Sequence, residues 1–150
     1  MPSPKGYKRE DVLDRAIELF RREGFSATST AELVAELGIN RKSMYAEFGS
    51  KQDLFEAALE RYSKVHLSRV LAPIEAPDAA LPEIRNSFAS YATGSDGQYN
   101  GLGCLMANTA VERASLDPGA ARFVNAYLER ITHAYRRALE NAIDKKELSA

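Results

Sequence analysis

The chain has 150 residues, 45% of them hydrophobic and 27% charged, which is typical of a folded globular protein and excludes an intrinsically disordered one. Its apolar runs fall short of the roughly 18 consecutive residues of a membrane span, its first residues form no signal peptide, and its single cysteine, Cys104, cannot form an intramolecular disulfide. The 20 basic and 21 acidic residues give a net charge of −1, so the total charge does not by itself indicate a nucleic-acid partner.

Apolar residues recur with the period of an α-helix through the first half of the chain. The predicted helices span about 8–23, 30–37, 41–48 and 52–71. Gly24, Gly38 and Gly49 end the first three, because glycine adopts the left-handed backbone of a helix terminus at little cost. Ser50 and Asp53 resemble a capping box at the start of the fourth, with Asp in place of Glu.

The second half of the chain predicts a linker at about 72–81, a helix at about 82–92 and a loop at about 93–103. Another helix follows at about 104–114, then a turn at 117–119 and a long final helix at about 121–145. Prolines mark the linker and glycines the loop, while Asp117-Pro118-Gly119 has the composition of a tight turn. Because strand patterns are poor throughout the chain, we expect an all-α fold.

The two short helices at 30–37 and 41–48 have the arrangement of a helix-turn-helix unit. Gly38 permits the sharp turn between them, and the apolar Ile39 fills the angle that they form. The longer helix before them is able to support both from behind. The pattern therefore predicts a DNA-binding unit near the N-terminus, provided that the second short helix exposes suitable side chains.

The first turn of the second short helix carries Arg41, Lys42 and Ser43, at the end of the helix that can enter a major groove. Arg and Lys donate to guanine, and Ser either donates or accepts at a base edge. Met44 and Phe48 lie one turn apart and are expected to anchor the other side of the helix in the core. From spacing alone a second interpretation stays open, in which Arg41 and Lys42 are ordinary solvated helix residues.

Residues 8–62 resemble the N-terminal domain of TetR-type (TetR/AcrR) transcriptional regulators in order and spacing. The matching runs are GFSATST at 24–30, Leu33-Val34 with Gly38, and INRKSMYAEFGSK at 39–51. The resemblance implies a three-helix DNA-binding domain of the helix-turn-helix type at 1–51. It implies a helical ligand-binding and dimerisation domain at 52–150.

The family pattern implies roles for seven residues of this chain. Phosphate contacts are implied for Thr28, Tyr45 and Lys51, and contacts in or at the major groove for Asn40, Arg41, Lys42 and Ser43. One departure is Glu47, where many members carry His or Tyr. A carboxylate there would repel DNA unless it turns away or pairs with a neighbour such as Arg41 or Lys51. This departure concerns a single backbone contact and not the whole domain.

The resemblance implies a ligand-responsive repressor that binds a palindromic operator as a homodimer and leaves it when a small molecule or an electrophile acts on it. The two helix-turn-helix units would lie about 34–36 Å apart, which matches successive major grooves. The open alternative is a helical protein-interaction module without sequence-specific DNA binding. An enzyme is not expected, because no catalytic constellation is visible. We expect a cytoplasmic protein whose partner is double-stranded DNA, with no membrane partner, cofactor or metal.

Polar and aromatic residues on otherwise apolar faces are candidate ligand contacts in the second part of the chain. They are His66, Phe88, Tyr91, Cys104, Met106, Asn108 and Tyr127. Packing is the alternative role for the aromatic residues and the methionine. Cys104 opens a helix, a position that favours a reactive thiolate, and its surroundings resemble the glycine-cysteine-leucine segment of a TetR-type subgroup with members that sense electrophiles or oxidants. A cysteine that acts as a small buried hydrophobe is the alternative.

The chain stops at 144–150, just past the predicted long helix. TetR-type chains usually continue through helices that pair in a four-helix dimer bundle. We therefore expect one of two situations. In the first, the chain is truncated or poorly ordered at its C-terminus, and in the second, it dimerises through another surface.

Overall fold

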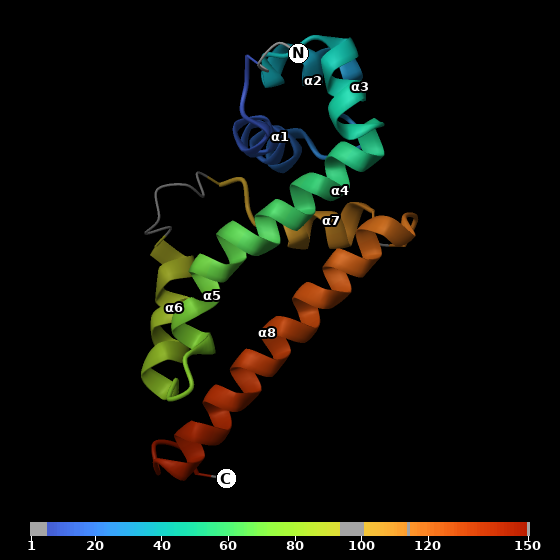
Figure 1. Ribbon diagram of the computed structural model, residues 1–150. Coiled ribbons are helices and arrows are strands. Elements are labelled where there is room, and N and C mark those ends of the chain that lie inside the picture. The colour runs from blue at the N-terminus through green and yellow to red at the C-terminus, as the bar shows by residue number, and fades with distance from the viewer. Residues whose placement is uncertain (1–5, 94–100, 114, 150) are drawn as a thin grey trace. The chain divides into compact units, whose positions relative to one another are not determined.

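The computed structural model describes residues 6–93, 101–113 and 115–149. Every regular element in these residues is helical, which confirms the all-α fold (Figure 1). The helices are α1 (Arg9–Glu23), α2 (Thr30–Leu37), α3 (Arg41–Phe48), α4 (Lys51–Tyr62), α5 (Ser68–Glu75), α6 (Leu81–Thr93), α7 (Leu105–Glu112) and α8 (Pro118–Asp144), with a π-helical turn, η1 (Ser63–Leu67), between α4 and α5. None of the described helices is long and apolar enough to cross a membrane.

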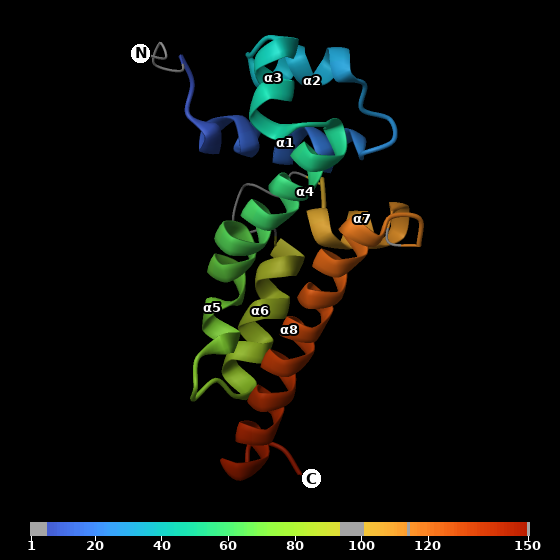
Figure 2. The ribbon, with the colours of Figure 1, turned by 45° about the vertical axis from the view of Figure 1, so that its right-hand side comes forward.

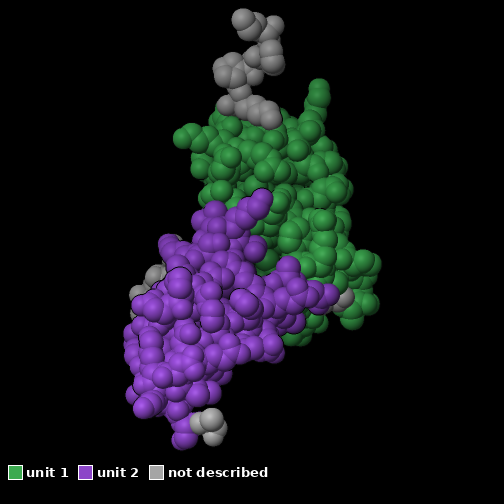
Figure 3. Space-filling model, turned by 60° about the horizontal axis from the view of Figure 1, so that its bottom comes forward, with its two compact units in different colours: residues 1–62, 102–124 green, residues 63–101, 125–150 purple. Residues whose placement is uncertain are grey.

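The chain packs into two compact units (Figure 3). Unit 1 comprises residues 1–62 and 102–124, which include α1 to α4, α7 and the first residues of α8. Unit 2 comprises residues 63–101 and 125–150, which include η1, α5, α6 and the rest of α8. The predicted boundary after residue 51 separates a DNA-binding domain from a regulatory domain by their functions, whereas the two units are defined by packing. The functional boundary stays a prediction.

The core of unit 1 forms around the apolar stripe of α1. Ile17 and Phe20 on this stripe are buried, and the Phe20 ring meets the Phe55 ring of α4 edge-on with 4.9 Å between centroids. Figures 1 and 2 show α2 and α3 on the same side of α1. Helices of eight residues are marginal in isolation, whereas full burial of one large apolar side chain contributes about 1.5–3 kcal/mol. Packing on α1 and α4 is therefore what holds α2 and α3 in place.

The single helix predicted at 52–71 is interrupted by the π-helical turn η1. The carbonyl oxygen of Ser63 accepts hydrogen bonds from the Ser68 hydroxyl at 3.3 Å and from the Arg130 guanidinium at 3.4 Å. Side chains thus insert into the backbone ladder at this point, which is a recognised cause of irregular helical turns. The apolar periodicity of the sequence over 52–71 does not indicate this π-helical turn.

The linker predicted at 72–81 is shorter in the structure, because α5 continues through Pro73 before it ends. A proline inside a helix removes one backbone hydrogen bond. Leu71 and Ile74, on either side of it, are nevertheless buried, and their packing keeps this last turn helical. The loop predicted at 93–103 falls mostly outside the described residues.

The turn predicted at Asp117-Pro118-Gly119 is instead the beginning of α8. The Asp117 carboxylate accepts hydrogen bonds from the backbone N–H groups of Gly119 at 2.9 Å and Ala120 at 3.2 Å, as an N-cap does. Pro118 takes the first helical position, where its missing N–H group costs nothing. Turns and helix starts share this composition, which is why the sequence alone did not separate them.

Candidate nucleic-acid interface and ligand cavity

The two short helices are fixed by caps at the turn between them and at the start of α2. Gly38 has a φ of 66°, the left-handed conformation that the sharp turn requires. The Asn40 side-chain oxygen accepts a hydrogen bond from the Ser43 backbone N–H at 2.8 Å and so caps α3, while its amide nitrogen remains a donor. At the start of α2, Ser29 and Glu32 form a reciprocal capping box. The predicted helix-turn-helix geometry is thereby confirmed.

One face of α3 is buried and the other faces outward. Met44 and Phe48 are buried together with Ile39 of the turn, as predicted. The predicted DNA contacts at exposed or partly exposed positions are Asn40, Arg41, Lys42, Ser43 and Tyr45. They place an amide, a guanidinium, an ammonium and two hydroxyl groups on one short stretch of helix. This set of donors matches the acceptors of guanine edges and DNA phosphates.

Thr28 and Lys51, the other two predicted DNA contacts, make internal hydrogen bonds. Thr28 is 1% exposed, and its hydroxyl donates to the Gly24 carbonyl at 2.6 Å. The Lys51 ammonium donates to the Phe25 carbonyl at 2.5 Å and lies 4.2 Å from the centre of the Phe25 ring. Burial, together with the nearby positive charge of Arg113, lowers the pKa of Lys51. Both side chains fix the loop between α1 and α2.

Glu47 forms an ion pair with a residue other than the two partners that the sequence suggested for it. Its carboxylate lies 3.4 Å from the Nε atom of Arg9, at the start of α1. The Glu47 side chain is 10% exposed and the Arg9 side chain 48%, so the carboxylate is the more buried member of the pair. The predicted partners were Arg41 and Lys51, and Lys51 turns toward Phe25 instead. Arg9 lies 38 positions earlier in the chain, and no local pattern links it to Glu47.

Glu112, at the C-terminal end of α7, is a residue that the sequence did not reveal. Its carboxylate accepts hydrogen bonds from the backbone N–H groups of Phe25 at 3.0 Å and Ser26 at 2.7 Å. Burial raises the pKa of Glu112, but the bonds from Ser26 and Phe25 outweigh this effect and leave the pKa below its ordinary value. The neighbouring Arg113 lies 4.4 Å from the centre of the Phe25 ring. The loop before α2 is thus held by α7 as well as by Lys51.

Further polar contacts within unit 1 join α7 and the start of α8 to α1 and α4. They are Arg21 to the Gly103 carbonyl at 3.0 Å, Gln52 to Asp117 at 2.6 Å and Arg122 to Glu56 at 2.8 Å. Arg21 is buried, so its pairing with the carbonyl satisfies donors that would otherwise be costly. These contacts fix the segment around α7 to the helices that support α2 and α3.

The predicted ligand contacts divide between the two units, with Cys104, Met106 and Asn108 in unit 1 and His66, Phe88, Tyr91 and Tyr127 in unit 2. Met106 is fully buried and is part of the core. Asn108 donates to the Leu102 carbonyl at 3.0 Å, and Cys104 is the half-buried N-cap residue of α7. Phe88 and Tyr91 are 62% and 52% exposed, so neither ring is part of the core, although the Phe88 ring lies 5.9 Å from the Tyr135 ring.

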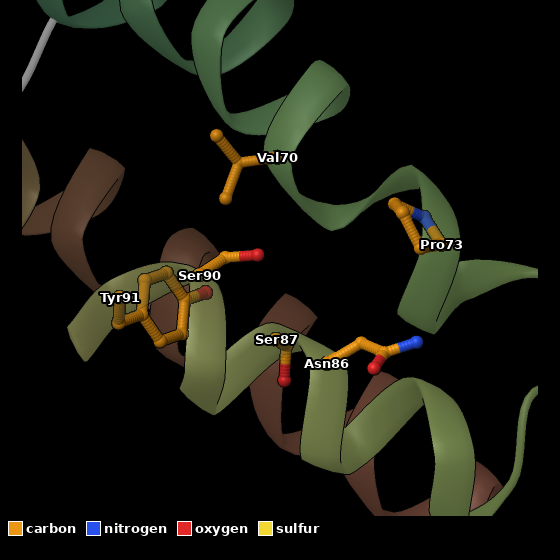
Figure 4. A pocket seen from close by; sticks show the side chains of 6 residues that line it. All are labelled: Val70, Pro73, Asn86, Ser87, Ser90 and Tyr91. Carbon is orange, nitrogen blue, oxygen red and sulfur yellow. The ribbon is translucent and has the colours of Figure 1, made fainter. Parts of the chain in front are cut away.

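A small cavity of about 80 Å³ lies in unit 2 between α5 and α6 (Figure 4). It is lined by Val70, Pro73, Asn86, Ser87, Ser90 and Tyr91. Of the predicted ligand contacts, Tyr91 is the one that lines it. The Ser87 hydroxyl also lies 2.7 Å from the Tyr135 hydroxyl, which holds it in place. The described lining combines hydroxyl and amide groups with apolar surface and contains no charged side chain.

Residues 12–58 match the model of the family described as bacterial regulatory proteins, tetR family. The chain is 33% identical over 138 residues to the HTH-type transcriptional regulator YezE of Bacillus subtilis (strain 168), with 92% of this chain and 71% of YezE covered. It is 31% identical over 131 residues to the HTH-type transcriptional repressor ComR of Escherichia coli (strain K12), with 85% of this chain and 60% of ComR covered. The fold is similar to the crystal structure of reduced E. coli NemR, with a TM-score of 0.71 and 22% identity over 94% of this chain and 74% of that one. This chain therefore belongs to the TetR family of bacterial regulatory proteins and is a helix-turn-helix transcriptional regulator.

Proposed function

We propose that this regulator is a repressor that binds a palindromic operator as a homodimer through the exposed face of α3. The observation that carries the proposal is that the predicted DNA contacts of α3 and its N-cap are exposed or partly exposed, while Met44 and Phe48 of the same helix are buried. The relative ComR is named a repressor, which supports the direction of regulation. Leu128, Leu139 and Ile143 of α8 are exposed and offer an apolar surface that a second copy could cover.

The proposed roles follow from the chemistry of each side chain. Arg41 and Lys42 donate to guanine O6 and N7, and the Ser43 hydroxyl and the Asn40 amide nitrogen serve further base-edge or sugar–phosphate acceptors. The Tyr45 hydroxyl binds a phosphate. In this proposal, Thr28 and Lys51 contribute through the backbone of the loop that they fix, since their polar groups already bond to it.

Selection of duplexes from a random-sequence library tests the proposal. The wild-type protein should enrich a palindrome whose half-sites lie about 34–36 Å apart or a multiple of that distance, with two protomers bound per duplex. The logarithm of the affinity should fall linearly with the logarithm of the salt concentration, because each neutralised phosphate releases counterions. A chain that enriches no duplex would instead be a helical protein-interaction module. Increased transcription from a promoter that overlaps the site would identify an activator.

The effector that we propose is a small uncharged molecule with hydrogen-bonding groups. The cavity between α5 and α6 presents hydroxyl and amide groups beside apolar surface, and its volume of about 80 Å³ lies well below the roughly 300–1,000 Å³ of typical ligand pockets. A ligand that binds the operator-free state more tightly than the operator-bound state would release the DNA, and only this difference in affinity can do so. An electrophile that reacts with Cys104 is the second effector class.

A panel of small uncharged alcohols, amides and phenols should contain a compound that raises the melting temperature of the wild-type protein, because a ligand of the native state stabilises it. The Tyr91→Ala variant should lose that response, whereas Phe88→Ala, which removes an exposed ring outside the cavity lining, should keep it. A compound that stabilises both variants equally binds elsewhere. In a separate DNA-binding assay, release by N-ethylmaleimide that disappears in Cys104→Ser would assign the response to the thiol instead.

A further inference from the structure

The ion pair between Arg9 and Glu47 lies beside the face of α3 that the proposed function assigns to DNA. Glu47 is one turn beyond Ser43 on α3, so both side chains lie on the same side of the helix. A surface depression is lined by Tyr7, Ser43 and Glu47, among others, which places the segment just before α1 beside this side of α3. The pair therefore flanks the residues that would enter a major groove.

The exposed member of this ion pair is the cation and not the carboxylate. The carboxylate of Glu47 is largely covered, whereas nearly half of the Arg9 side chain is exposed. A guanidinium has five N–H donors, so Arg9 can contact Glu47 through its Nε atom and a second acceptor at the same time. A guanidinium binds a phosphate through two parallel N–H bonds, which a lysine ammonium cannot match.

The guanidinium is also held in position from below. Its central carbon lies 5.1 Å from the centre of the Phe48 ring, a cation–π distance, and Phe48 is itself a buried anchor of α3. The Glu47 carboxylate and the Phe48 ring therefore restrict the conformation of the Arg9 side chain in the absence of DNA. A side chain that is ordered in advance loses less conformational entropy when it binds.

We propose that Arg9 is a phosphate-binding residue at the edge of the DNA interface and that Glu47 is its positioning residue. The inference rests on the proposed insertion of α3 into the major groove. It also explains how a carboxylate is tolerated at position 47: the carboxylate holds a cation that faces the DNA backbone.

Salt-dependent binding to a random-sequence duplex of about three helical turns tests the inference without knowledge of the operator. Arg9→Ala should weaken binding at low salt and reduce the slope of log affinity against log salt by about 0.9 for each bound protomer, the value for one phosphate contact. The double variant Arg9→Ala/Glu47→Gln has the same net charge as the wild type, and its slope should stay reduced. If the double variant regains the wild-type slope and affinity, Arg9 only neutralises Glu47 and the inference is wrong.

Arg22→Ala is the matched control, because it removes an exposed arginine from the opposite end of α1, about 20 Å away. Its salt slope should equal that of the wild type. Thermal melting shows whether each variant is folded at the temperature of the binding assay, and only folded variants are compared. A wild-type protein that fails to bind the duplex would overturn the proposed function. A wild type that binds, together with an Arg9→Ala variant of equal slope, would overturn only the inference about Arg9.

Discussion

Arg41→Ala should weaken binding to the selected operator by roughly 5- to 150-fold, which corresponds to about 1–3 kcal/mol for a lost two-bond contact to guanine. The Arg41 side chain lies in the exposed first turn of α3, and the buried Met44 on the same helix fixes its direction. Titration of labelled operator and of a random duplex measures the effect. The loss should be large for the operator and small for the random duplex, because base contacts determine which sequence is bound, whereas phosphate contacts position the protein on any duplex.

Arg41→Lys separates the geometry of the contact from its charge. Lysine keeps the positive charge but cannot form the paired donor geometry of a guanidinium, so the salt slope should persist while discrimination against the random duplex falls. Arg136→Ala, which removes an exposed arginine from α8 in unit 2, should bind as the wild type does. An equal loss on operator and random DNA would show that Arg41 binds a phosphate rather than a base.

The helix-turn-helix elements were predictable because the signals that define them are local. The bounds of α2 and α3 agree with the predicted 30–37 and 41–48, since an N-cap, a left-handed glycine and an apolar period all fall within a few residues. Local signals were ambiguous at Pro73 and Pro118. A proline is compatible with a linker, a first helical position or a last buried turn, and only tertiary packing decides among these.

The polar contacts around the candidate interface were not predictable, because they join distant parts of the chain. Glu112 and Ser26 are 86 residues apart, and Arg9 and Glu47 are separated by 38. The same distance effect explains Lys51, whose ammonium turns toward the Phe25 carbonyl, 26 residues before it. A sequence pattern identifies residues that are able to bind a phosphate, but the fold determines which of their side chains form hydrogen bonds within the protein instead.

Glu112→Ala should destabilise the protein by about 2 kcal/mol. The substitution removes a charged acceptor from two backbone N–H groups, those of Phe25 and Ser26, and a hydrogen bond to a charged group contributes about 1.5–3 kcal/mol when fully shielded. Glu112 is only half-buried, so water recovers part of this loss. Denaturant unfolding measures the change, and hydrogen exchange at the Phe25 and Ser26 amides should become faster. Glu36→Ala, an exposed control on α2, should change stability by no more than about 0.5 kcal/mol.

Glu112→Gln tests the contribution of the charge itself, through its pH dependence. The pKa of Glu112 in the folded protein is below its ordinary 4.5, so the carboxylate stabilises the fold above the unfolded pKa and loses this contribution as the pH falls through the folded value. Other carboxyl groups titrate in both proteins, and the difference in unfolding free energy between wild type and Glu112→Gln isolates this one. That difference should be constant near neutral pH and shrink as the pH falls below about 4.5. A difference that does not vary with pH would mean that α7 holds the loop before α2 by shape and neutral hydrogen bonding, without its charge.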